Sequence, residues 1–475
     1  MLTKTQSRQL QALAQQKILI LGGGREGLST YKFLRRHFPQ LPLTIADQNK
    51  KLKNNQLWKE IFIKDRKLNG FFGPESYLQH LLDYDLIFRT PGIQPTLPAI
   101  IEAKQKGVLF TSNTQLFLKL VRGKTIGVTG TKGKSTTSSL ISHLLQAGGK
   151  KVQLLGNIGV PPLDLLEEID GKTYTVMEMS AHQLQDLKQS PHLAVIQNIT
   201  SEHLDYYKNT AAYVEAKSAI ARWQKPSDYL VYSDDFATSR DFASLSKAQK
   251  LVYGQKETPE HLAFVHGRAI FYRGPEDKLP RSLADRKKIK LLGKHNLYNI
   301  MPAIIVAKHF LITDEQITTA LYNFTPLRHR LEYVQTVKDV SYYNDSLSTT
   351  PQASVAALQT FTEKKVILIA GGHERHQDFS HLANKIIKNQ VRALILFPPT
   401  GKRLKRTVID LAIKKKVLVP QFYEVEKMVA AVQQATAIAQ PQDVVLLSPG
   451  AASFGEFKDY ADRGDQFCQA VKNLL

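Results

Sequence analysis

The sequence predicts an α/β protein of three domains, in which mostly parallel sheets carry helices on both faces. Short apolar runs bounded by turn residues recur along the 475 residues, and stretches with apolar residues at i, i+3 and i+4 separate them. This alternation is typical of parallel sheets, because a crossover between parallel strands is usually a helix. Glycine-rich junctions between an apolar run and a helical stretch follow Leu21, Val128 and Ala370. One such junction per sheet indicates three sheets.

The apolar runs and helical stretches fix the expected order of elements. Nine runs are predicted to be buried strands: Lys17–Leu21, Leu43–Ala46, Leu86–Phe88, Thr125–Val128, Tyr174–Met177, Ala194–Gln197, Val366–Ala370, Ala393–Phe397 and Val444–Leu447. Apolar spacing predicts helices at Ser135–Leu145 and Ile304–Phe310. A turn at Thr90-Pro91-Gly92 precedes a helix and a fresh strand, and Asn323–Pro326 ends a helical pattern. We therefore predict domains at 1–113, 114–325 and 326–475.

Composition and charge narrow the class of protein. Lysine and arginine number 64 against 42 acidic residues, for a net charge of +22. Such an excess of basic residues favours polyanionic partners: nucleic acid, an anionic membrane surface or phosphate-bearing small molecules. The basic clusters are scattered, which favours solvated surface over a nucleic-acid footprint. The single cysteine, Cys468, excludes an internal disulfide and a thiolate metal cluster within one chain.

No apolar run approaches the roughly 18 residues that a membrane-spanning helix needs. The first residues lack the apolar core of a signal peptide. We expect a cytoplasmic protein.

The second junction carries the strongest motif. Gly130-Thr131-Lys132-Gly133-Lys134-Ser135-Thr136-Thr137 follows a predicted strand and opens a predicted helix. Glycines let backbone N–H groups approach phosphate, the helix N-terminus adds positive charge, and a lysine and a hydroxyl reach phosphate and magnesium. The general pattern has a glycine where this chain has Val128, so the loop is a compact variant. A nucleoside triphosphate site is favoured over an ordinary glycine-rich turn.

The first junction, Leu21–Gly27, is similar to a dinucleotide fingerprint, with Asp47 some twenty residues further on. It predicts a nucleotide-like ligand at the first sheet. A redox cofactor and a nucleotide-linked substrate both remain open at this point.

Three further side chains follow strands of the second domain. Glu178 and His203, near a phosphate loop, can hold magnesium, and Lys217 lies beyond them. Each also has an ordinary explanation: a carboxylate at a helix N-terminus, a hydrogen-bonded loop histidine and a solvated charge. Taken alone, His203 and Lys217 favour the ordinary explanation.

In the third domain, polar or glycine-rich segments follow three predicted strands, where ligands bind in open α/β sheets. The first segment, Asn344-Asp345-Ser346, follows the strand-like run Val340–Tyr343. The other two, Gly371-Gly372 and Ser448–Phe454, follow two of the nine runs given above. Ser453 is outside any nucleophile-elbow pattern, which disfavours acyl-enzyme chemistry. The spacing in His373-Glu374-Arg375-His376 differs from zinc motifs, and we predict a polar loop.

Taken in order, these motifs resemble the Mur ligase family, ATP-dependent enzymes that join amino acids to the peptidoglycan precursor. The chain is most similar to the branch that adds D-glutamate. The resemblance runs nearly end to end and rests on LGGGREGLS, RTPGI, GVTGTKGKSTT, GNIG, MEMSAHQL, NITSEHLDYY, YVEAKSAI, GKHNLYNI, RHRLE, YNDSLSTTP, AGGHERHQDF and SPGAASFGEFKDYADRGDQF. It implies a Rossmann-like N-terminal domain for a UDP-linked substrate, a central P-loop ATPase-like domain, and a C-terminal Rossmann-like domain for the amino acid.

The resemblance also implies roles for individual residues. The ATP-binding positions are Gly130, Thr131, Lys132, Gly133, Lys134, Ser135, Thr136, Asn299, Arg330 and Asp345. The catalytic positions are Lys134, Glu178, His203 and Lys217, and the Mg²⁺ ligands, for two expected ions, are Ser135, Glu178, His203 and Lys217, the last as a carbamate. The positions for the UDP-linked substrate are Arg25, Glu26, Asp47, Gln48, Thr90, Gly92, Asn157 and Gln183, with His203 near its muramoyl-peptide end. The D-glutamate positions are Thr349, Arg375, Ser453 and Tyr460.

Four departures from the family pattern stand out. Leu347 occupies a position where many relatives have lysine, and Arg375 one where lysine is usual. Arginine can bind a carboxylate through two parallel hydrogen bonds, so it is not equivalent to lysine. Arg328 replaces a proline, and Ala181-His182 replaces a serine–aromatic pair.

The implied reaction is ATP-dependent amide bond formation between UDP-N-acetylmuramoyl-L-alanine and D-glutamate through an acyl phosphate. The resemblance implies a monomeric cytoplasmic enzyme of cell-wall synthesis, and through it a role in cell shape and division. The alternatives are a related ligase for another amino acid, a folate ligase, which the first-domain loop disfavours, and a P-loop binding module that holds nucleic acid.

Binding of the implied substrates needs only a few basic residues, so most of the net charge of +22 is not explained by the active site. We interpret the surplus as a surface property, including weak contact with anionic membrane.

Overall fold

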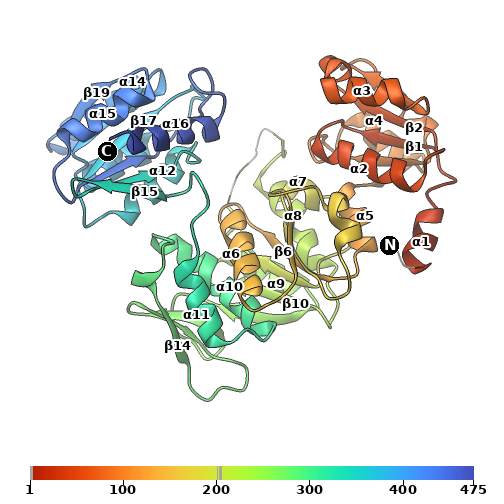
Figure 1. Cartoon of the computed structure of the whole chain (residues 1–475), viewed down its shortest axis with the longest axis horizontal. Coiled ribbons are helices and arrows are strands. Elements are labelled where there is room, and N and C mark those ends of the chain that lie inside the picture. The colour runs from red at the N-terminus through yellow and green to blue at the C-terminus, as the bar shows by residue number, and fades with distance from the viewer. Residues whose placement is uncertain (1–3, 201, 203–205, 475) are drawn as a thin grey trace. The chain divides into compact units, whose positions relative to one another are not determined.

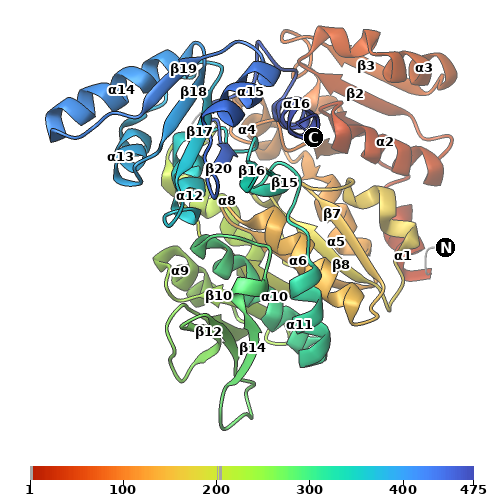
Figure 2. The same ribbon diagram turned by 60° about the vertical axis from the view of Figure 1, so that its left-hand side comes forward.

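The computed structural model describes residues 4–200, 202 and 206–474. Contacts divide the chain into two compact units, which are described separately. The first unit runs up to Lys288 and includes Tyr298–Tyr322, and the second comprises Ile289–Leu297 together with the chain from Asn323 onward. The described strands form three sheets, two in the first unit and one in the second (Figure 1, Figure 2). The predicted α/β class is confirmed, whereas the boundaries near 113 and 325 stay predictions.

The first sheet has the strand order β3-β2-β1-β4-β5, and all its neighbours are parallel. Its strands are β1 (Ile18–Leu21), β2 (Leu43–Asp47), β3 (Leu68–Phe72), β4 (Leu86–Arg89) and β5 (Leu109–Thr111). Its helices are α1 (Lys4–Gln11), α2 (Arg25–His37), α3 (Gln56–Lys64) and α4 (Pro98–Gln105), with short 3₁₀ turns η1 (Lys50–Asn54) and η2 (Leu81–Asp83).

Strand β1 is apolar throughout because both of its faces are covered. Ile18 and Ile20 join one core cluster, and Leu19 and Leu21 join another. The strand order reverses beside β1, which leaves a crevice at the carboxyl ends of the strands.

The second sheet has the order β14-β13-β12-β11-β10-β9-β6-β8-β7. Strands β7 to β12 pair in parallel around β6, and β12, β13 and β14 are antiparallel. The strands are β6 (Lys124–Thr129), β7 (Val152–Gly156), β8 (Tyr174–Glu178), β9 (Leu193–Ile196), β10 (Tyr229–Ser233), β11 (Gln249–Tyr253), β12 (His261–His266), β13 (Ala269–Tyr272) and β14 (Arg281–Asp285). The helices are α5 (Asn113–Leu120), α6 (Lys134–Ala147), α7 (Ala181–Leu184), α8 (Thr210–Arg222), α9 (Ala237–Leu245), α10 (Leu297–His309) and α11 (Asp314–Asn323), with 3₁₀ turns η3 (Pro162–Glu168) and η4 (Arg286–Lys288).

The third sheet, in the second unit, has the order β15-β16-β20-β17-β18-β19, and only β15 and β16 are antiparallel. Its strands are β15 (Glu332–Val337), β16 (Val340–Asn344), β17 (Val366–Gly371), β18 (Ala393–Phe397), β19 (Gln421–Glu424) and β20 (Val444–Leu447). Its helices are α12 (Pro351–Thr360), α13 (Ser380–Lys388), α14 (Thr400–Lys415), α15 (Met428–Ile438) and α16 (Tyr460–Lys472), with a 3₁₀ turn η5 (Lys294–Asn296).

Helices cover both faces of this third sheet. Along β17, Leu368 packs in the cluster that contains residues of α12, α13 and α14, and Ile369 packs in the cluster that contains residues of α15 and α16. Figure 2 shows α15 and α16 near β20. Successive residues of β17 are therefore buried on opposite faces of the sheet, which explains why the strand is a continuous apolar run in the sequence.

All nine predicted strands are present, with ends shifted by one residue or not at all. The nine runs leave out the remaining strands, among them the antiparallel β13 and β14. Strand β14 lies at the sheet edge and mixes polar and apolar residues, so it carries no continuous apolar run. The predicted helix at Ile304–Phe310 is the second half of α10, which continues through Pro302. Pro302 has no N–H to donate to the Tyr298 carbonyl. That carbonyl instead accepts from Gln197 Nε2 at 3.0 Å and from the Tyr253 hydroxyl at 3.4 Å.

Candidate active site

A cavity of about 410 Å³ lies in the first unit. Its walls come from the carboxyl ends of strands in the first sheet and from loops of the second sheet. All eight residues predicted to bind the UDP-linked substrate line it: Arg25, Glu26, Asp47, Gln48, Thr90, Gly92, Asn157 and Gln183. The structure therefore brings together residues that are up to 158 positions apart.

In the glycine loop after β1, Gly22 leaves no room for a side chain. Gly22 has φ +105°, and a Cβ there would lie 1.9 Å from Thr90 Oγ1. The N–H of Gly23 donates to Asp47 Oδ2 at 2.7 Å, and the N–H of Asn49 donates to Oδ1 of the same carboxylate at 2.7 Å. Asp47 thus holds the loop in place while it lines the cavity.

Glu26 on α2, beside the first sheet, and Gln183 on α7, beside the second sheet, form a hydrogen bond in the cavity wall. Gln183 Nε2 donates to Glu26 Oε1 at 2.6 Å, and Gln183 Oε1 accepts from the Ser180 N–H at 3.0 Å in a capping box at the start of α7. Glu26 Oε2 is buried and has no hydrogen-bond partner among the described residues. Burial raises the pKa of the Glu26 carboxyl. This pair leaves a polar oxygen ready for a donor on a ligand.

The phosphate loop connects β6 to α6 as the motif predicts. Gly130 and Gly133 have φ +154° and +87°, and a Cβ on Gly133 would lie 2.3 Å from Asn299 Oδ1. Lys134 Nζ donates to the carbonyls of Gly130 at 2.9 Å and Thr131 at 3.1 Å. The Lys134 ammonium therefore lies over its own loop.

Neighbouring polar groups fix this loop from behind. Thr137 Oγ1 donates to Asn299 Oδ1 at 3.1 Å and accepts from Gln197 Nε2 at 2.9 Å. The Thr136 hydroxyl is buried without a hydrogen-bond partner among the described residues, whereas Ser135 is half-buried. Lys132 is exposed, and its Nζ pairs with Glu202 at 2.5 Å.

Lys217 on α8 is almost fully buried, with 1% of its surface exposed. Its Nζ donates to the Gly130 carbonyl at 2.9 Å, the same oxygen that Lys134 contacts. Burial, and then the nearby Lys134 ammonium, hold the pKa of the Lys217 amine well below its usual range. A solvated surface charge is therefore the wrong explanation for this residue.

Glu178 ends β8 and is 2% exposed. Its Oε1 accepts from Asn157 Nδ2 at 2.7 Å, and its Oε2 is buried without a partner among the described residues. It does not cap α7, because Ser180 does. An unpartnered carboxylate oxygen beside a phosphate loop fits a hard cation such as magnesium, which usually takes one or two protein carboxylates and several phosphate or water oxygens.

The other proposed metal ligands divide between described and undescribed residues. His203 lies outside the described residues. Within residues 4–200, 202 and 206–474, no three His, Cys, Asp or Glu side chains gather as a metal site.

In the second unit, Asp345 follows β16 and is 4% exposed. Its carboxylate accepts from the Leu331 N–H at 3.1 Å, from Ser348 Oγ at 2.5 Å and from Ser448 Oγ at 2.8 Å. Burial outweighs these hydrogen bonds and the positive charge of the half-buried Arg330, so the pKa of Asp345 rises to about 6.

The four residues predicted to receive D-glutamate occupy segments that follow the neighbouring strands β16, β20 and β17. Thr349 is half-buried and Ser453 is 4% exposed. Tyr460, 41% exposed, begins α16. Arg375 is exposed in the polar loop after β17, with its guanidinium 5.5 Å from the Phe454 ring centre.

Sequence reasoning missed a buried pair behind the cavity. Arg89, the last residue of β4, is 2% exposed and donates through Nε to Asp186 Oδ2 at 2.6 Å. Its Nη1 also donates to the Thr90 carbonyl at 3.0 Å. The Tyr206 hydroxyl donates to the carbonyls of Pro91 and Ile93 on the same turn. The arginine in the RTPGI segment was the available signal.

None of the described helices combines the length and apolar character that crossing a bilayer requires.

Residues 128–307 match the Mur ligase middle domain, and residues 329–450 match the Mur ligase glutamate ligase domain. A UDP-N-acetylmuramoylalanine–D-glutamate ligase of Symbiobacterium thermophilum is 35% identical over 402 residues, covering 84% of this chain and 86% of the relative. The corresponding ligase of Clostridium tetani is 31% identical over 464 residues, covering 96% and 97%.

Solved structures agree on the fold. MurF of Acinetobacter baumannii aligns with a TM-score of 0.61 at 14% identity, covering 98% of each chain. MurF ligase of Thermotoga maritima in complex with ADP aligns with a TM-score of 0.56 at 15% identity, covering 96% of this chain and 95% of that one. The cavity, the phosphate loop and relatives that share more than 30% identity over most of their length lead to one conclusion: the chain belongs to the family of UDP-N-acetylmuramoylalanine–D-glutamate ligases, within the Mur ligases.

Proposed function

We propose that the chain adds D-glutamate to UDP-N-acetylmuramoyl-L-alanine at the expense of ATP, in the cytoplasmic synthesis of the peptidoglycan precursor. The observation that carries the proposal is the cavity, because all eight residues assigned to the UDP-linked substrate line this one space. Its volume of about 410 Å³ lies within the range of small-molecule sites.

The two ends of the UDP-linked substrate are assigned to different walls of the cavity. Arg25, Glu26, Asp47 and Gln48 take the uridine end, beside Thr90 and Gly92. Asn157 and Gln183, with His203, take the muramoyl-peptide end. Asn157 also donates to Glu178, so the substrate carboxylate is assigned to the side of the cavity that leads toward the phosphate loop.

The reaction follows from the groups on that side. The substrate carboxylate attacks the γ-phosphorus of ATP, the bond to the β-phosphate oxygen breaks, and ADP leaves an acyl phosphate. The D-glutamate amine then attacks the acyl carbon, loses a proton and displaces inorganic phosphate. Lys134 and the N–H groups at the start of α6 stabilise the charge on the transferred phosphoryl group. Asn299, Arg330 and Asp345 are assigned to the nucleotide.

Magnesium fits the residues present, because Glu178 has a buried oxygen without a partner. The proposed ligands are Ser135, Glu178, His203 and a carbamylated Lys217. Bound magnesium supplies charge neutralisation to the phosphates. The lowered pKa favours the neutral, nucleophilic form of the Lys217 amine. The neutral amine adds to carbon dioxide and releases one proton, which converts it into an anionic carbamate whose oxygens can act as carboxylate-like ligands.

Thr349, Arg375, Ser453 and Tyr460 are the proposed contacts of D-glutamate. Leu347 and Arg375 differ from the usual lysines, and this favours a second candidate, a ligase of the same type for another amino acid. A guanidinium can hold a side-chain carboxylate through two hydrogen bonds, so Arg375 is compatible with an acidic amino acid.

A phosphate-release assay tests both candidates. The purified chain is given ATP, Mg²⁺, UDP-N-acetylmuramoyl-L-alanine and each member of a panel of D- and L-amino acids. D-glutamate is expected to give the highest kcat/KM, and a higher value with another amino acid would select the second candidate. Lys134→Ala is expected to abolish turnover, and unchanged turnover would remove the assignment of the phosphate loop. ATP binding without amino-acid-dependent phosphate release would indicate a binding module instead.

We further propose that the chain acts as a monomer and touches anionic membrane weakly. Residues 413–419, after and at the end of α14, are all exposed and combine three consecutive lysines with apolar side chains, of which Ile413 is 70% and Leu418 96% exposed. Each lysine near an anionic surface contributes about 1 kcal/mol.

Sedimentation with phosphatidylglycerol-containing vesicles at low salt tests the membrane proposal, and size-exclusion chromatography with light scattering tests the monomer. Leu418→Ser is expected to lower vesicle binding. Leu279→Ser, which removes another exposed leucine (77%), is the matched control. Absence of binding by the unmodified chain would overturn the membrane contact.

A further inference from the structure

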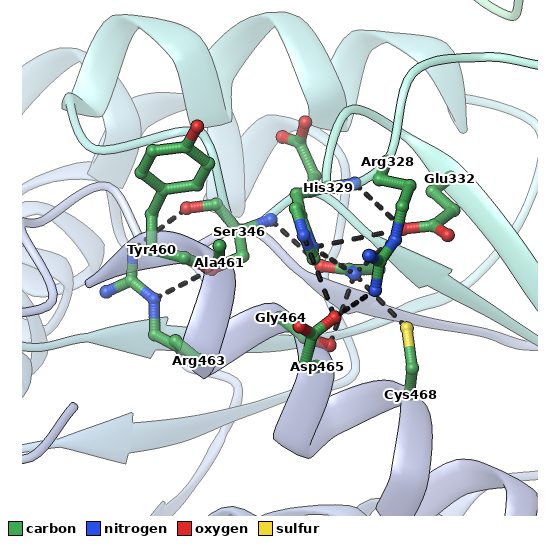
Figure 3. Close-up of polar contacts among 12 residues, drawn as sticks. Arg328, His329, Glu332, Ser346, Tyr460, Ala461, Arg463, Gly464, Asp465 and Cys468 are labelled. Atoms are coloured by element: carbon green, nitrogen blue, oxygen red, sulfur yellow. Dashed lines mark hydrogen bonds and ion pairs between the residues drawn. The ribbon is translucent and has the colours of Figure 1, made fainter. Parts of the chain in front are cut away.

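Arg463 on α16 is the largest fully buried side chain among the described residues, with 1% of its surface exposed. Its Nε donates to Ser346 Oγ at 3.0 Å and its Nη2 to the Ser346 carbonyl at 2.9 Å (Figure 3). Its Nη1 donates to the Ala451 carbonyl at 3.1 Å. All three acceptors are neutral. The guanidinium is thus hydrogen-bonded, but its charge is not balanced by these contacts.

Two other arginines that are wholly or partly buried have acidic partners. Arg89 pairs with Asp186, and Arg392 pairs with Asp443 through Nε at 2.8 Å. Within the described part of the chain, Arg463 forms no ion pair with a carboxylate. Burial lowers its pKa to about 9, which still leaves it protonated at neutral pH.

The acidic residues of α16 are engaged elsewhere. Asp465 pairs with Arg328, and its Oδ1 lies 3.7 Å from His329 Nε2 (Figure 3). Asp462 accepts from the Lys458 N–H at 3.0 Å and from Gln466 Nε2 at 3.2 Å. A buried charge without a counterion is costly, so a purely structural role would be served as well by an apolar side chain of similar volume.

The position of the guanidinium gives a reason for its presence. Ser346 follows β16, Ala451 follows β20, and Gly372 follows β17, and these three strands are neighbours in the third sheet. A Cβ on Gly372 would lie 3.3 Å from Arg463 Nη1, so the guanidinium packs against that glycine as well. Ser346 Oγ in turn donates to the Tyr460 carbonyl at 2.7 Å. One side chain therefore contacts all three segments at the carboxyl end of the sheet.

We infer that Arg463 is a positioning residue for the incoming amino acid, and that its unpaired charge favours a dicarboxylic one. The inference rests on the proposed function. Ser346 precedes Thr349 by three residues, Ala451 precedes Ser453 by two, and Tyr460 is linked through Ser346. Arg463 thus fixes the backbone beside three of the four residues assigned to D-glutamate. The positive charge of Arg463 lies behind these segments and attracts an anionic ligand to their outer side. Because the guanidinium is buried, dissolved salt screens its charge less than it screens a surface charge.

Arg463→Lys, which keeps the charge and loses the planar fork, tests the inference. Its KM for D-glutamate is expected to rise about tenfold, the effect of one or two lost hydrogen bonds. Its KM for the UDP-linked substrate should stay within about twofold, because that ligand is assigned to the first unit. Arg463→Met, which also removes the charge, should raise the KM for D-glutamate about 100-fold. Arg392→Lys makes the same change at an arginine with an acidic partner and should leave both KM values as they are.

Hydrogen exchange supplies a readout that needs no turnover. Amides in segments 345–349 and 450–460 should exchange faster in Arg463→Lys than in Arg392→Lys. If neither these amides nor the KM for D-glutamate changes, the inference is overturned. It is also overturned if both KM values and kcat worsen together, since a general loss of structure predicts that pattern.

Ser346→Ala covers the case in which the arginine variants do not fold. It removes only the hydroxyl between Arg463 and Tyr460, and a KM for D-glutamate equal to that of the unmodified chain would count against the inference. Failure of the unmodified chain to release phosphate with D-glutamate would instead reject the proposed function, and hydrogen exchange would still decide whether Arg463 holds the segments.

Discussion

Replacing Asp345 by asparagine is expected to stabilise the second unit at neutral pH and to weaken nucleotide binding. The carboxyl group is 4% exposed, and its pKa rises from an ordinary 3.8 to about 6 because burial disfavours the charged form. The amide preserves the geometry, since its oxygen can accept from the Leu331 N–H and its NH₂ group can donate to the hydroxyls of Ser348 and Ser448.

The sign and size of the effect follow from proton linkage. An acid whose pKa is raised on folding binds more protons in the native state between the two pKa values, so stability falls as pH rises from about 4 to about 6. Above that window the ionised carboxylate lowers the free energy of unfolding by about 3 kcal/mol, and at pH 4.5 by about 1 kcal/mol. The advantage of Asp345→Asn over the unmodified chain should therefore grow by about 2 kcal/mol between pH 4.5 and pH 7.5.

Urea unfolding followed by far-ultraviolet circular dichroism measures this difference. Both tryptophans, Trp58 and Trp223, belong to the first unit, so tryptophan fluorescence provides an internal reference that the substitution should leave in place. A difference between variant and unmodified chain that does not change with pH would refute the linkage. Asp443→Asn is the control of opposite sign, because it breaks the ion pair with Arg392 and should destabilise the unit. The same Asp345→Asn chain should show a higher KM for ATP.

Three further predictions concern the first unit. In Gly22→Ala, the alanine must adopt the positive φ of Gly22, and its Cβ would lie 1.9 Å from Thr90 Oγ1. The variant should therefore bind the UDP-linked substrate more weakly, with little change in the KM for ATP, as measured by steady-state kinetics. Arg89→Met leaves Asp186 without its closest cationic partner and should lower the free energy of unfolding by about 3 kcal/mol in urea titrations, whereas an unchanged midpoint would show that the pair is dispensable. Lys217→Ala should lose most activity and regain part of it with added acetate; no recovery at any acetate concentration would argue against the carbamate.

The sequence was sufficient for the elements that carry a local signal. The phosphate loop needs glycines at Gly130 and Gly133 because both have positive φ, and this requirement is written in the motif. Buried parallel strands such as β17 read as apolar runs because both faces are covered. The membership of the family, inferred from ordered motifs, is confirmed by the relatives.

Other features depend on pairings that distant segments make. Arg89 and Asp186 are separated by 97 positions, and nothing in the sequence shows that the arginine of the RTPGI segment pairs with this acid. Lys217 and Arg463 are of residue types that are rarely buried, so their sequence context alone favours exposure. Only the fold shows that one lies under the phosphate loop and the other behind three strand ends. The assigned roles of the site residues remain predictions that the proposed kinetics address.

The second unit includes the segment Ile289–Leu297, which is separated in the sequence from the rest of that unit. The residues between them form two helices that belong to the first unit. Ile289 and Leu291 are buried, and Leu292 packs against the core of the third sheet. A fragment that starts at residue 326 would therefore lack part of its own core and should fold poorly when expressed alone. Conversely, a single protease cut after Tyr322 would leave that segment bound within the second unit, so the two cleaved pieces should remain together on a sizing column until a denaturant releases them.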